Sequence, residues 1–318
     1  MAWRILMTWR SDRKLRKFGL ILAASIMLVN LMVVNVHRTS AQLRPAEIPS
    51  RAIISPSLIV TPTTPRLGDT LSVVVLSRTQ QAPVVQITSK AGTKIYPAYN
   101  LGNNRWRSLI PTTPLTTPGT LKIQAQIGEF VLNPKTVSLQ GRSFPTQRIW
   151  LPSGQDGNVS DWEFDQVDAF KKTVSSEKLW NGPFRRPNDG DISTTYGIRR
   201  YYNGVFADDY FHRGVDYAGD EGSAIVAPAA GRVVFMGYEK DGFKVHGNVI
   251  GLDHGQGVLS IFLHMSSIRV KRGDRIQAGQ TIGTLGDTGA ATGPHLHWGL
   301  YVNGECVDPV AWRETGLD

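Results

Sequence analysis

Short alternating runs dominate the middle of the chain. In residues 58–140, runs such as LSVVVLS, APVVQITS, KIYPAYN and LKIQAQIG alternate apolar and polar residues or are rich in β-branched residues. Turn signals such as GD, KAG, GNN and TTPG separate these runs at a spacing of about ten residues. The pattern predicts a small immunoglobulin-like β-sandwich of about six or seven strands over residues 58–141. This segment contains no histidine and almost no acidic residue, so we expect a binding or spacer role.

A helical period replaces the alternation after the sandwich. Apolar residues recur at roughly helical spacing over residues 158–180, at Trp162, Val167, Phe170, Val174 and Leu179. Ser160 and Asp161 are suitable N-terminal caps, and Gly182 followed by Pro183 ends the pattern. We therefore expect a linker with one connecting helix over residues 142–181, packed on the domain that follows.

Glycine-punctuated β runs fill the rest of the chain. They include GRVVFMGY, GNVIGLDHGQG, LSIFLHMS and HLHWGLYVNG, and no long helical period interrupts them. Such runs predict an antiparallel, curled or barrel-like sheet with tight turns over residues 182–318. The expected fold class is therefore mainly β.

The N-terminus joins a basic block to an apolar one. Residues 1–18 carry six basic residues against the single acidic residue Asp12, and the uncharged residues 19–36 follow. This order is typical of a membrane-targeting segment whose basic end stays in the cytoplasm. The 18-residue length of the run favours an uncleaved anchor helix, whereas the small residues ending at Ala41 favour a cleaved signal peptide. In both interpretations the chain after residue 42 lies outside the cytoplasm.

Charge and proline content refine this division. We expect a basic segment with a signal anchor or signal peptide over residues 1–41 and a proline-containing linker over residues 42–57. The basic block contributes +5 to the net charge of +9, which leaves about +4 for the remainder. This mild positive charge suits an anionic surface such as a cell wall or lipid headgroups. The chain has no Lys/Arg cluster with interleaved aromatic residues, so nucleic acid is not an expected partner.

Histidines are concentrated in the C-terminal segment. Six of the seven lie within 86 residues: His212, His246, His254, His264, His295 and His297. A single buried histidine is usually a hydrogen-bonded core residue, but that explanation does not extend easily to six. Because Cys306 is the only cysteine, no internal disulfide can form, and a metal site must use histidine and carboxylate ligands.

Alternation places two pairs of these side chains on shared faces. Residues i and i+2 of a strand point to the same side, so His295 and His297 in PHLHWGL face one way. His212 and Asp216, four residues apart in FHRGVDYAG, also share a face if the chain is extended. With one imidazole of the His295/His297 pair, they offer three ligands to zinc and leave a fourth position open for water, as in catalytic sites.

His264 ends the apolar strand LSIFLHMSS, where an unpaired polar ring would be costly. If this strand neighbours the other two, His264 and the non-ligand histidine of the pair flank the metal-bound water. Amide hydrolysis requires a base and donors for the developing oxyanion, and two imidazoles can divide these tasks. Spacing alone does not decide whether His295 or His297 is the metal ligand.

These motifs resemble a known family. FHRGVDYAG, the segment from LHMSSIRVKRGD to GPHLHWGLYVNG, and the lead-in PNDGDISTTYGIRR closely resemble the M23 family of zinc metallopeptidases, also called lysostaphin-type or LytM-like peptidases. The resemblance covers about residues 182–312 and combines His-x-x-x-Asp, a strand histidine and His-x-His in the order of that family. It implies an antiparallel β peptidase domain of the M23 type over residues 182–318.

The resemblance also assigns roles. It implies that His212, Asp216 and His297 bind one Zn²⁺ per catalytic domain, and that His264 and His295 are catalytic histidines that do not bind the metal. The family cleaves peptide bonds in the stems and cross-bridges of bacterial peptidoglycan, so we expect a zinc metalloendopeptidase. Some members have lost ligands and activate other hydrolases. The alternative is therefore a non-catalytic wall-binding regulator or activator.

Location and partners follow from these expectations. We expect an extracytoplasmic protein of the periplasm or cell envelope, membrane-anchored or secreted, with peptidoglycan peptides as substrate. The N-terminal segment would contact the membrane, and the β-sandwich would contact cell-wall or division proteins. His254 is interpreted as a structural turn residue and His246 as a surface or groove residue. Other chemistries fit poorly, because neither a Gly-Lys-Ser/Thr phosphate loop nor a Gly-x-Ser-x-Gly elbow is present.

Overall fold

The computed structural model describes residues 55–150 and 161–317. These residues are mainly β, as predicted, with two short α-helices among many strands. In these two ranges no helix has the length and apolar character needed to cross a membrane. The predicted targeting segment, residues 1–41, lies outside the described residues.

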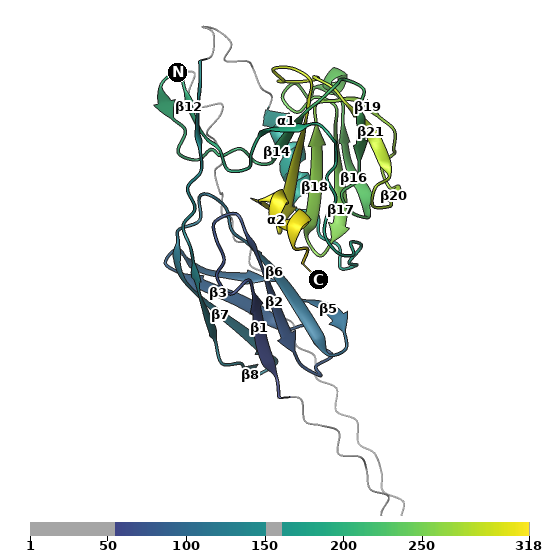
Figure 1. The fold of residues 1–318 in the computed structure, drawn as a ribbon. Coiled ribbons are helices and arrows are strands. Elements are labelled where there is room, and N and C mark those ends of the chain that lie inside the picture. Colours follow the sequence, from purple (N-terminus) through teal and green to yellow (C-terminus); the bar gives the residue numbers. More distant parts are fainter. Residues whose placement is uncertain (1–54, 151–160, 318) are drawn as a thin grey trace, which may run out of the picture. The chain divides into compact units, whose positions relative to one another are not determined.

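Two antiparallel sheets make up the N-terminal module (Figure 1). One has the strand order β1-β2-β6-β5, and the other has the order β4-β3-β7-β8 with β9 also paired to β7. The strands are β1 Ser57–Thr61, β2 Thr70–Leu76, β3 Val84–Ser89, β4 Gly92–Tyr96, β5 Tyr99–Gly102, β6 Arg105–Pro111, β7 Gly119–Ile127, β8 Phe130–Val131 and β9 Lys135–Leu139.

The two sheets enclose one apolar core. Leu71, Val73 and Val75 of β2 are fully buried, and they belong to the same cluster as Val85 and Ile123 of the other sheet. Alternating residues of each strand therefore meet between the sheets, as in a sandwich. The immunoglobulin-like character of this module stays a prediction.

The module has more strands than predicted. Residues 57–139 contain nine strands, against the expected six or seven. One reason is the run KIYPAYN, which was predicted as a single strand. Pro97 has no N–H for a ladder hydrogen bond, and the chain changes sheets there, since β4 pairs with β3 and β5 pairs with β6.

The predicted linker also contains a strand. β10, Thr146–Ile149, pairs in parallel with β12, Arg199–Tyr202, which continues into β13, Val205–Phe206. Asn203 and Gly204 connect β12 to β13 with φ of 48° and 86°, the conformation that a two-residue hairpin turn requires. Residues 142–181 are therefore not a plain linker with one helix, because β10 gains backbone hydrogen bonds from a strand of the next domain.

A large sheet forms the centre of the C-terminal domain. Its order is β11-β14-β22-β18-β17-β16-β20, with β23 paired to β22, and β14, β18, β17 and β16 lie in succession in Figure 1. The strands are β11 Asp191–Thr194, β14 Val215–Ala218, β16 Gly231–Gly237, β17 Val249–Gly255, β18 Val258–Leu263, β20 Arg275–Ile276, β22 His295–Val302 and β23 Glu305–Val307. A smaller sheet comprises β15 Ala224–Val226, β21 Thr281–Leu285 and β19 Met265–Ile268, and helix α2 spans Pro309–Glu314.

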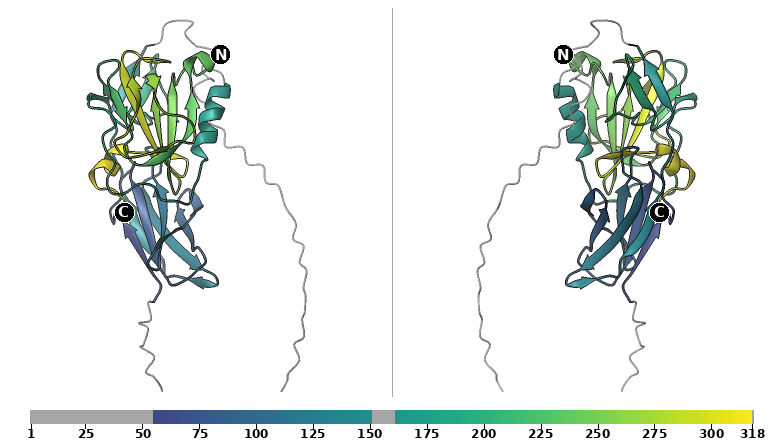
Figure 2. Two further views of the ribbon diagram at one scale, coloured as in Figure 1. Left: turned by 90° about the vertical axis from the view of Figure 1, so that its right-hand side faces the viewer. Right: turned by 90° about the vertical axis from the view of Figure 1, so that its left-hand side faces the viewer.

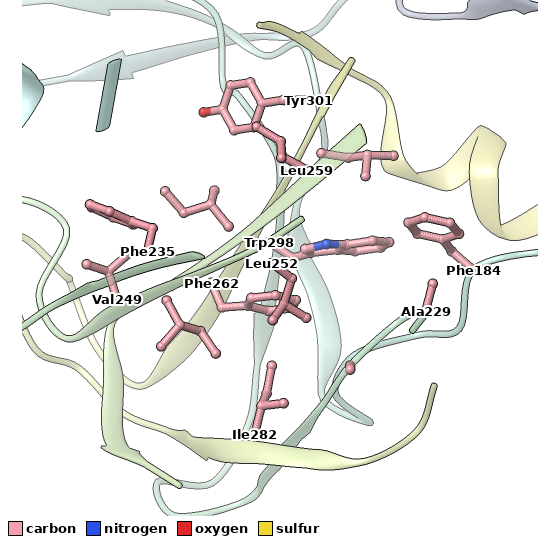
Figure 3. Close-up of a cluster of buried hydrophobic side chains, with 14 of the residues drawn as sticks. Phe184, Ala229, Phe235, Val249, Leu252, Leu259, Phe262, Ile282, Trp298 and Tyr301 are labelled. Atoms are coloured by element: carbon pink, nitrogen blue, oxygen red, sulfur yellow. The ribbon is translucent and has the colours of Figure 1, made fainter. Parts of the chain in front are cut away.

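Buried hydrophobic side chains cover both faces of the large sheet (Figure 3). Trp298 of β22 is fully buried among side chains that include Leu252 and Phe262. Each such side chain contributes about 1.5–3 kcal/mol when it leaves water. This burial fixes which face of β22 points inward, and the opposite face carries His295 and His297.

Helix α1, Asp161–Lys171, packs against the large sheet (Figure 2). Val167 and Phe170 are buried, and the Phe170 ring stacks on Phe235 of β16 with centroids 5.2 Å apart. The predicted connecting helix therefore exists and packs on the following domain. Trp162 and Val174, which were predicted on its buried face, are 46% and 54% exposed.

The helix ends about ten residues earlier than the periodicity predicted. Beyond Lys171 the chain lies beside the turn between β17 and β18. The Ser175 carbonyl accepts from the Gln256 N–H at 2.6 Å, and the Leu179 N–H donates to the His254 carbonyl at 2.9 Å. These hydrogen bonds replace the helical ones, because tertiary contacts outweigh weak helix propensity in a segment with Thr, Val and Ser.

His254 lies in β17 and its ring is fully buried. Its Nδ1–H donates to the Ala230 carbonyl at 2.8 Å, and its Nε2 accepts from Ser260 Oγ at 2.9 Å. Ser260 Oγ in turn accepts from Trp298 Nε1 at 3.2 Å. His254 is thus a neutral core residue in a strand, not a turn residue, and burial lowers its pKa to about 4.

We predict that His254 makes stability depend on pH between about 6.5 and 4. The folded pKa is about 4 and the unfolded pKa is about 6.5, so acidification protonates the unfolded chain first. The contribution of His254 to the free energy of unfolding is complete above the unfolded pKa. It decreases as pH falls through this window, and it has been lost below the folded pKa. Its total is on the order of 3 kcal/mol.

Urea unfolding of wild type and His254→Gln checks this prediction. Glutamine does not titrate, so the difference in unfolding free energy between the two proteins should be larger at about pH 7.5 than at about pH 5. A difference that is the same at both pH values would contradict it.

Candidate metal centre

Three side chains, two of them from neighbouring strands, converge on one point. Asp216 of β14 lies opposite His297 of β22 in the antiparallel ladder, and His212 precedes β14. Asp216 Oδ1 is 3.1 Å from His212 Nε2 and 2.8 Å from His297 Nδ1, and the two nitrogens are 3.1 Å apart. The structure therefore brings together the three residues predicted as ligands, and His297 is the member of its pair that meets the other two.

This donor set suits a divalent metal ion. In the described residues, His212, Asp216 and His297 offer ligand atoms that all lie within 4.8 Å of one another. Imidazole nitrogen and carboxylate oxygen are typical zinc ligands, and tetrahedral bonds of about 2.0–2.1 Å place ligand atoms about 3.3 Å apart. The observed separations of 2.8 to 3.1 Å are close to that value, so these residues fit a zinc ion.

Backbone groups set the positions of these ligands. The Nδ1–H of His212 donates to the Thr195 carbonyl at 2.9 Å, which turns Nε2 toward Asp216. Gly214 allows β14 and β22 to approach, since a Cβ at this position would clash with the Trp298 carbonyl and lie 2.7 Å from His297 Nε2. The absence of a side chain at residue 214 is therefore part of the site.

Electrostatics favour the metal-binding protonation states. Burial raises the pKa of Asp216, but hydrogen bonds with His212 and His297 outweigh burial and hold the pKa well below its usual value. Burial lowers the pKa of His297. An ionised carboxylate and a neutral imidazole are the forms that coordinate a metal.

His264 and His295 form a second pair, with ring centroids 4.6 Å apart. The Nδ1–H of His264 donates to the Thr288 carbonyl at 2.8 Å, and the Nδ1–H of His295 donates to the Gly293 carbonyl at 2.8 Å. Each ring is therefore held as the tautomer whose Nε2 keeps its lone pair. Burial and the neighbouring His295 lower the pKa of His264 to about 3, so its ring is neutral at physiological pH.

His264 lies between β18 and β19 with φ of 63°. Residues with a Cβ rarely adopt this left-handed conformation, and asparagine and histidine tolerate it better than most. Backbone hydrogen bonds hold it there, since the His264 N–H donates to the His246 carbonyl at 3.1 Å. The strand histidine of the sequence motif is thus a residue that ends the strand.

Two residues connected to this pair were not predicted. Thr288 accepts from the His264 ring, and Glu163 of α1 is fully buried with an oxygen 2.7 Å from His246 Nδ1. His246, predicted at the surface or in a groove, is therefore largely enclosed. The sequence offered one indication that Glu163 is unusual. It lies four residues before Val167, so a charged residue falls on the apolar face of the helix.

Cys306 is separate from this chemistry. Its thiol is buried and donates to the Arg213 carbonyl at 3.0 Å. Burial raises the pKa of this thiol to about 12, so the thiolate form needed for nucleophilic attack is scarce near neutral pH.

Comparison with known families agrees with this geometry. Residues 210–309 match the model of peptidase family M23. The chain contains an M23 peptidase domain. The match begins just before His212 and ends after β23, so it excludes α1. It includes both groups of the site, which are His212, Asp216, His264, His295 and His297.

Curated relatives share this domain. The chain is 35% identical over 154 residues to the peptidoglycan DD-endopeptidase ShyC of Vibrio cholerae, which covers 48% of this chain and 33% of the relative. It is 33% identical over 129 residues to the murein hydrolase activator NlpD of Escherichia coli, which covers 41% of this chain and 31% of the relative. The matched part of the chain thus spans about a third of the length of these relatives.

A solved structure extends the likeness beyond the M23 domain. A protein of Pseudomonas aeruginosa assigned to peptidase M23 superposes with a TM-score of 0.58 at 25% sequence identity, covering 80% of this chain and 96% of that one. A superposition over four-fifths of the chain must include elements outside residues 210–309. The fold of the M23 domain and of part of the region before it is therefore shared.

We predict that Gly214→Ala weakens both metal binding and stability. The added methyl group collides with the backbone of β22 and with the His297 ring, which costs about 1–3 kcal/mol. Metal titration and urea unfolding measure the two effects. The control is Gly141→Ala, whose Cβ would meet only Pro118 at 4.0 Å. Equal metal affinity in wild type and Gly214→Ala would refute the prediction.

Proposed function

We propose that this protein is a zinc metalloendopeptidase that hydrolyses peptide bonds in the stems or cross-bridges of peptidoglycan. The observation that carries the proposal is the meeting of His212, Asp216 and His297 beside the His264/His295 pair. The relationship to ShyC, a peptidoglycan DD-endopeptidase, supports the choice of substrate. A wall substrate also supports a location in the cell envelope, outside the cytoplasm.

His212, Asp216 and His297 would hold one Zn²⁺. Zinc bound by three protein ligands polarises a carbonyl group and lowers the pKa of a bound water to about 7. The chain contributes the charge and the orientation of the ligands. Asp216 supplies one negative charge, and the hydrogen bond from His212 to Thr195 fixes which ring nitrogen is available.

His264 and His295 would carry the proton transfers. Both rings donate their Nδ1–H to a carbonyl, so both present a basic Nε2. Burial and the neighbouring His295 lower the pKa of His264 to about 3, so this nitrogen is unprotonated before the reaction. A protonated ring can then donate to the leaving amine or to the oxyanion of the tetrahedral intermediate.

The alternative is a non-catalytic activator of another wall hydrolase. The likeness to NlpD, a murein hydrolase activator, supports this candidate. An activator has no need for the ligand geometry, however, and here three ligands and two further imidazoles lie in positions suited to catalysis. We therefore favour the enzyme.

Asp216→Ala tests the proposal. Removing the only carboxylate of the ligand set should weaken zinc binding by more than about a hundredfold and abolish release of peptides from purified peptidoglycan. The control is Asp220→Ala, which removes an exposed carboxylate from the segment after β14. Zinc content by elemental analysis and fragments by mass spectrometry are the two measurements. A wild-type protein that binds no zinc, or an Asp216→Ala variant that still cleaves, would exclude the proposed enzyme.

His264 can be tested without disturbing the fold. His264→Asn and His264→Ala should both lower kcat by about a hundredfold to ten-thousandfold and retain zinc, because neither change removes a ligand. Asparagine tolerates φ of 63° better than alanine does, so His264→Asn should be more stable than His264→Ala by about 1 kcal/mol. Steady-state kinetics and thermal unfolding separate the two effects. Near-normal kcat in either variant would remove His264 from the mechanism.

A further inference from the structure

Glu163 occupies an unusual position for a carboxylate. It lies in α1 on the same face as the buried Val167 and Phe170, and it is itself 0% exposed. Burying a charge without partners is costly, so its contacts indicate what it does. Burial raises the pKa of Glu163, but the hydrogen bonds from His246 and Val245 outweigh burial and keep the pKa below its usual value.

The carboxylate holds one loop, residues 243–248. It accepts from the Val245 N–H at 3.1 Å, from the His246 N–H at 2.8 Å and from His246 Nδ1 at 2.7 Å. Two of these three donors belong to the backbone. Glu163 therefore fixes the path of the loop as well as one side chain.

That loop fixes the backbone of His264. The His246 carbonyl accepts from the His264 N–H at 3.1 Å, and the Asn248 carbonyl accepts from the Met265 N–H at 3.0 Å. These two bonds lie on either side of the φ of 63° at His264. A left-handed residue keeps its conformation only if the surroundings hold it, and here the surroundings are the loop bound by Glu163.

The same loop also fixes the ring of His264. The Thr288 carbonyl, which accepts from His264 Nδ1, belongs to a segment joined to the loop by two further bonds. The Asn248 N–H donates to Thr288 Oγ1 at 2.9 Å, and the Ala290 N–H donates to the Val245 carbonyl at 3.0 Å. Backbone and ring of His264 therefore both depend on the position of residues 243–248.

We propose that Glu163 is a positioning residue for His264, acting through the loop of residues 243–248. Helix α1, which lies outside the matched residues 210–309, is then part of the active site in this chain. The inference rests on the proposed role of His264 in catalysis. This role differs from a purely structural one, because the hydrogen bonds of Glu163 connect, through the loop, to one side chain of the site.

Glu163→Gln in the full chain tests this inference. The substitution keeps the size of the side chain, but its NH2 group faces N–H donors and cannot accept from them. We expect kcat to fall by about tenfold to a hundredfold with KM changed by less than about twofold, as for a displaced catalytic group. Zinc content should be unchanged. The matched control is Asp165→Asn, which removes an exposed carboxylate from the same helix and should leave all parameters at wild-type values.

Hydrogen–deuterium exchange supplies a readout that does not depend on activity. Glu163→Gln should accelerate exchange in residues 243–248 and in the segment that contains His264, while strands β1 to β9 exchange as in wild type. If wild type proves to have no peptidase activity, the exchange comparison alone decides. If Glu163→Gln does not fold, Glu163→Asp replaces it, because its shorter carboxylate keeps the charge but cannot reach all three donors.

Three outcomes would overturn the inference. The first is exchange and kcat equal to those of Asp165→Asn. The second is a loss of kcat without faster exchange around His264, which would mean that Glu163 acts by another route. The third is faster exchange throughout the domain together with a lower melting temperature, which would make Glu163 a general stabilising residue.

Discussion

The pairing of β14 with β22 is the constraint on which the site depends. In this register Asp216 lies opposite His297, and Val215 lies opposite Trp298. A shift by one residue would move Trp298 to the face that carries the histidines and the histidines to the face that Trp298 fills, because side chains alternate between faces. Trp298 is fully buried, so the apolar core resists that shift. Hydrophobic burial on one face thereby sets the ligand geometry on the other.

The two functional pairs are supported in different ways. The ligands Asp216 and His297 lie in paired strands of the large sheet, where ladder hydrogen bonds keep them rigid. His264 lies at the end of β18 in a left-handed conformation, and loops hold it. Loops permit ring orientations that the regular pleat of a strand does not. They require hydrogen-bond partners such as Thr288 and the buried Glu163 to keep those orientations.

Strand alternation and motif spacing predicted much of this site. The shared face of His295 and His297 follows from a period of two. The contact between His212 and Asp216 does not follow from that period, because His212 lies before β14 and outside any strand. The sequence could not show which strands are neighbours, since the contact between Asp216 and His297 spans 81 residues. The extent of α1 was overestimated, because hydrogen bonds to Ser175 and Leu179 compete with the helix in a way that local periodicity does not register.

Glu163 illustrates a more general limit of prediction from sequence. A glutamate in a helix usually faces solvent, and only its three donors, two on the backbone and one on the His246 ring, explain its burial. Every residue except proline has a backbone N–H, so a sequence does not show which residues donate to Glu163. The proposed ligand set, in contrast, consists of specific side chains that a sequence motif does show. The proposed metal ligands are therefore recognisable from a motif, while the groups that orient His264 emerge only from the contacts of the folded chain. The proposed metal binding and the proposed proton transfer consequently depend on separate sets of contacts within one domain.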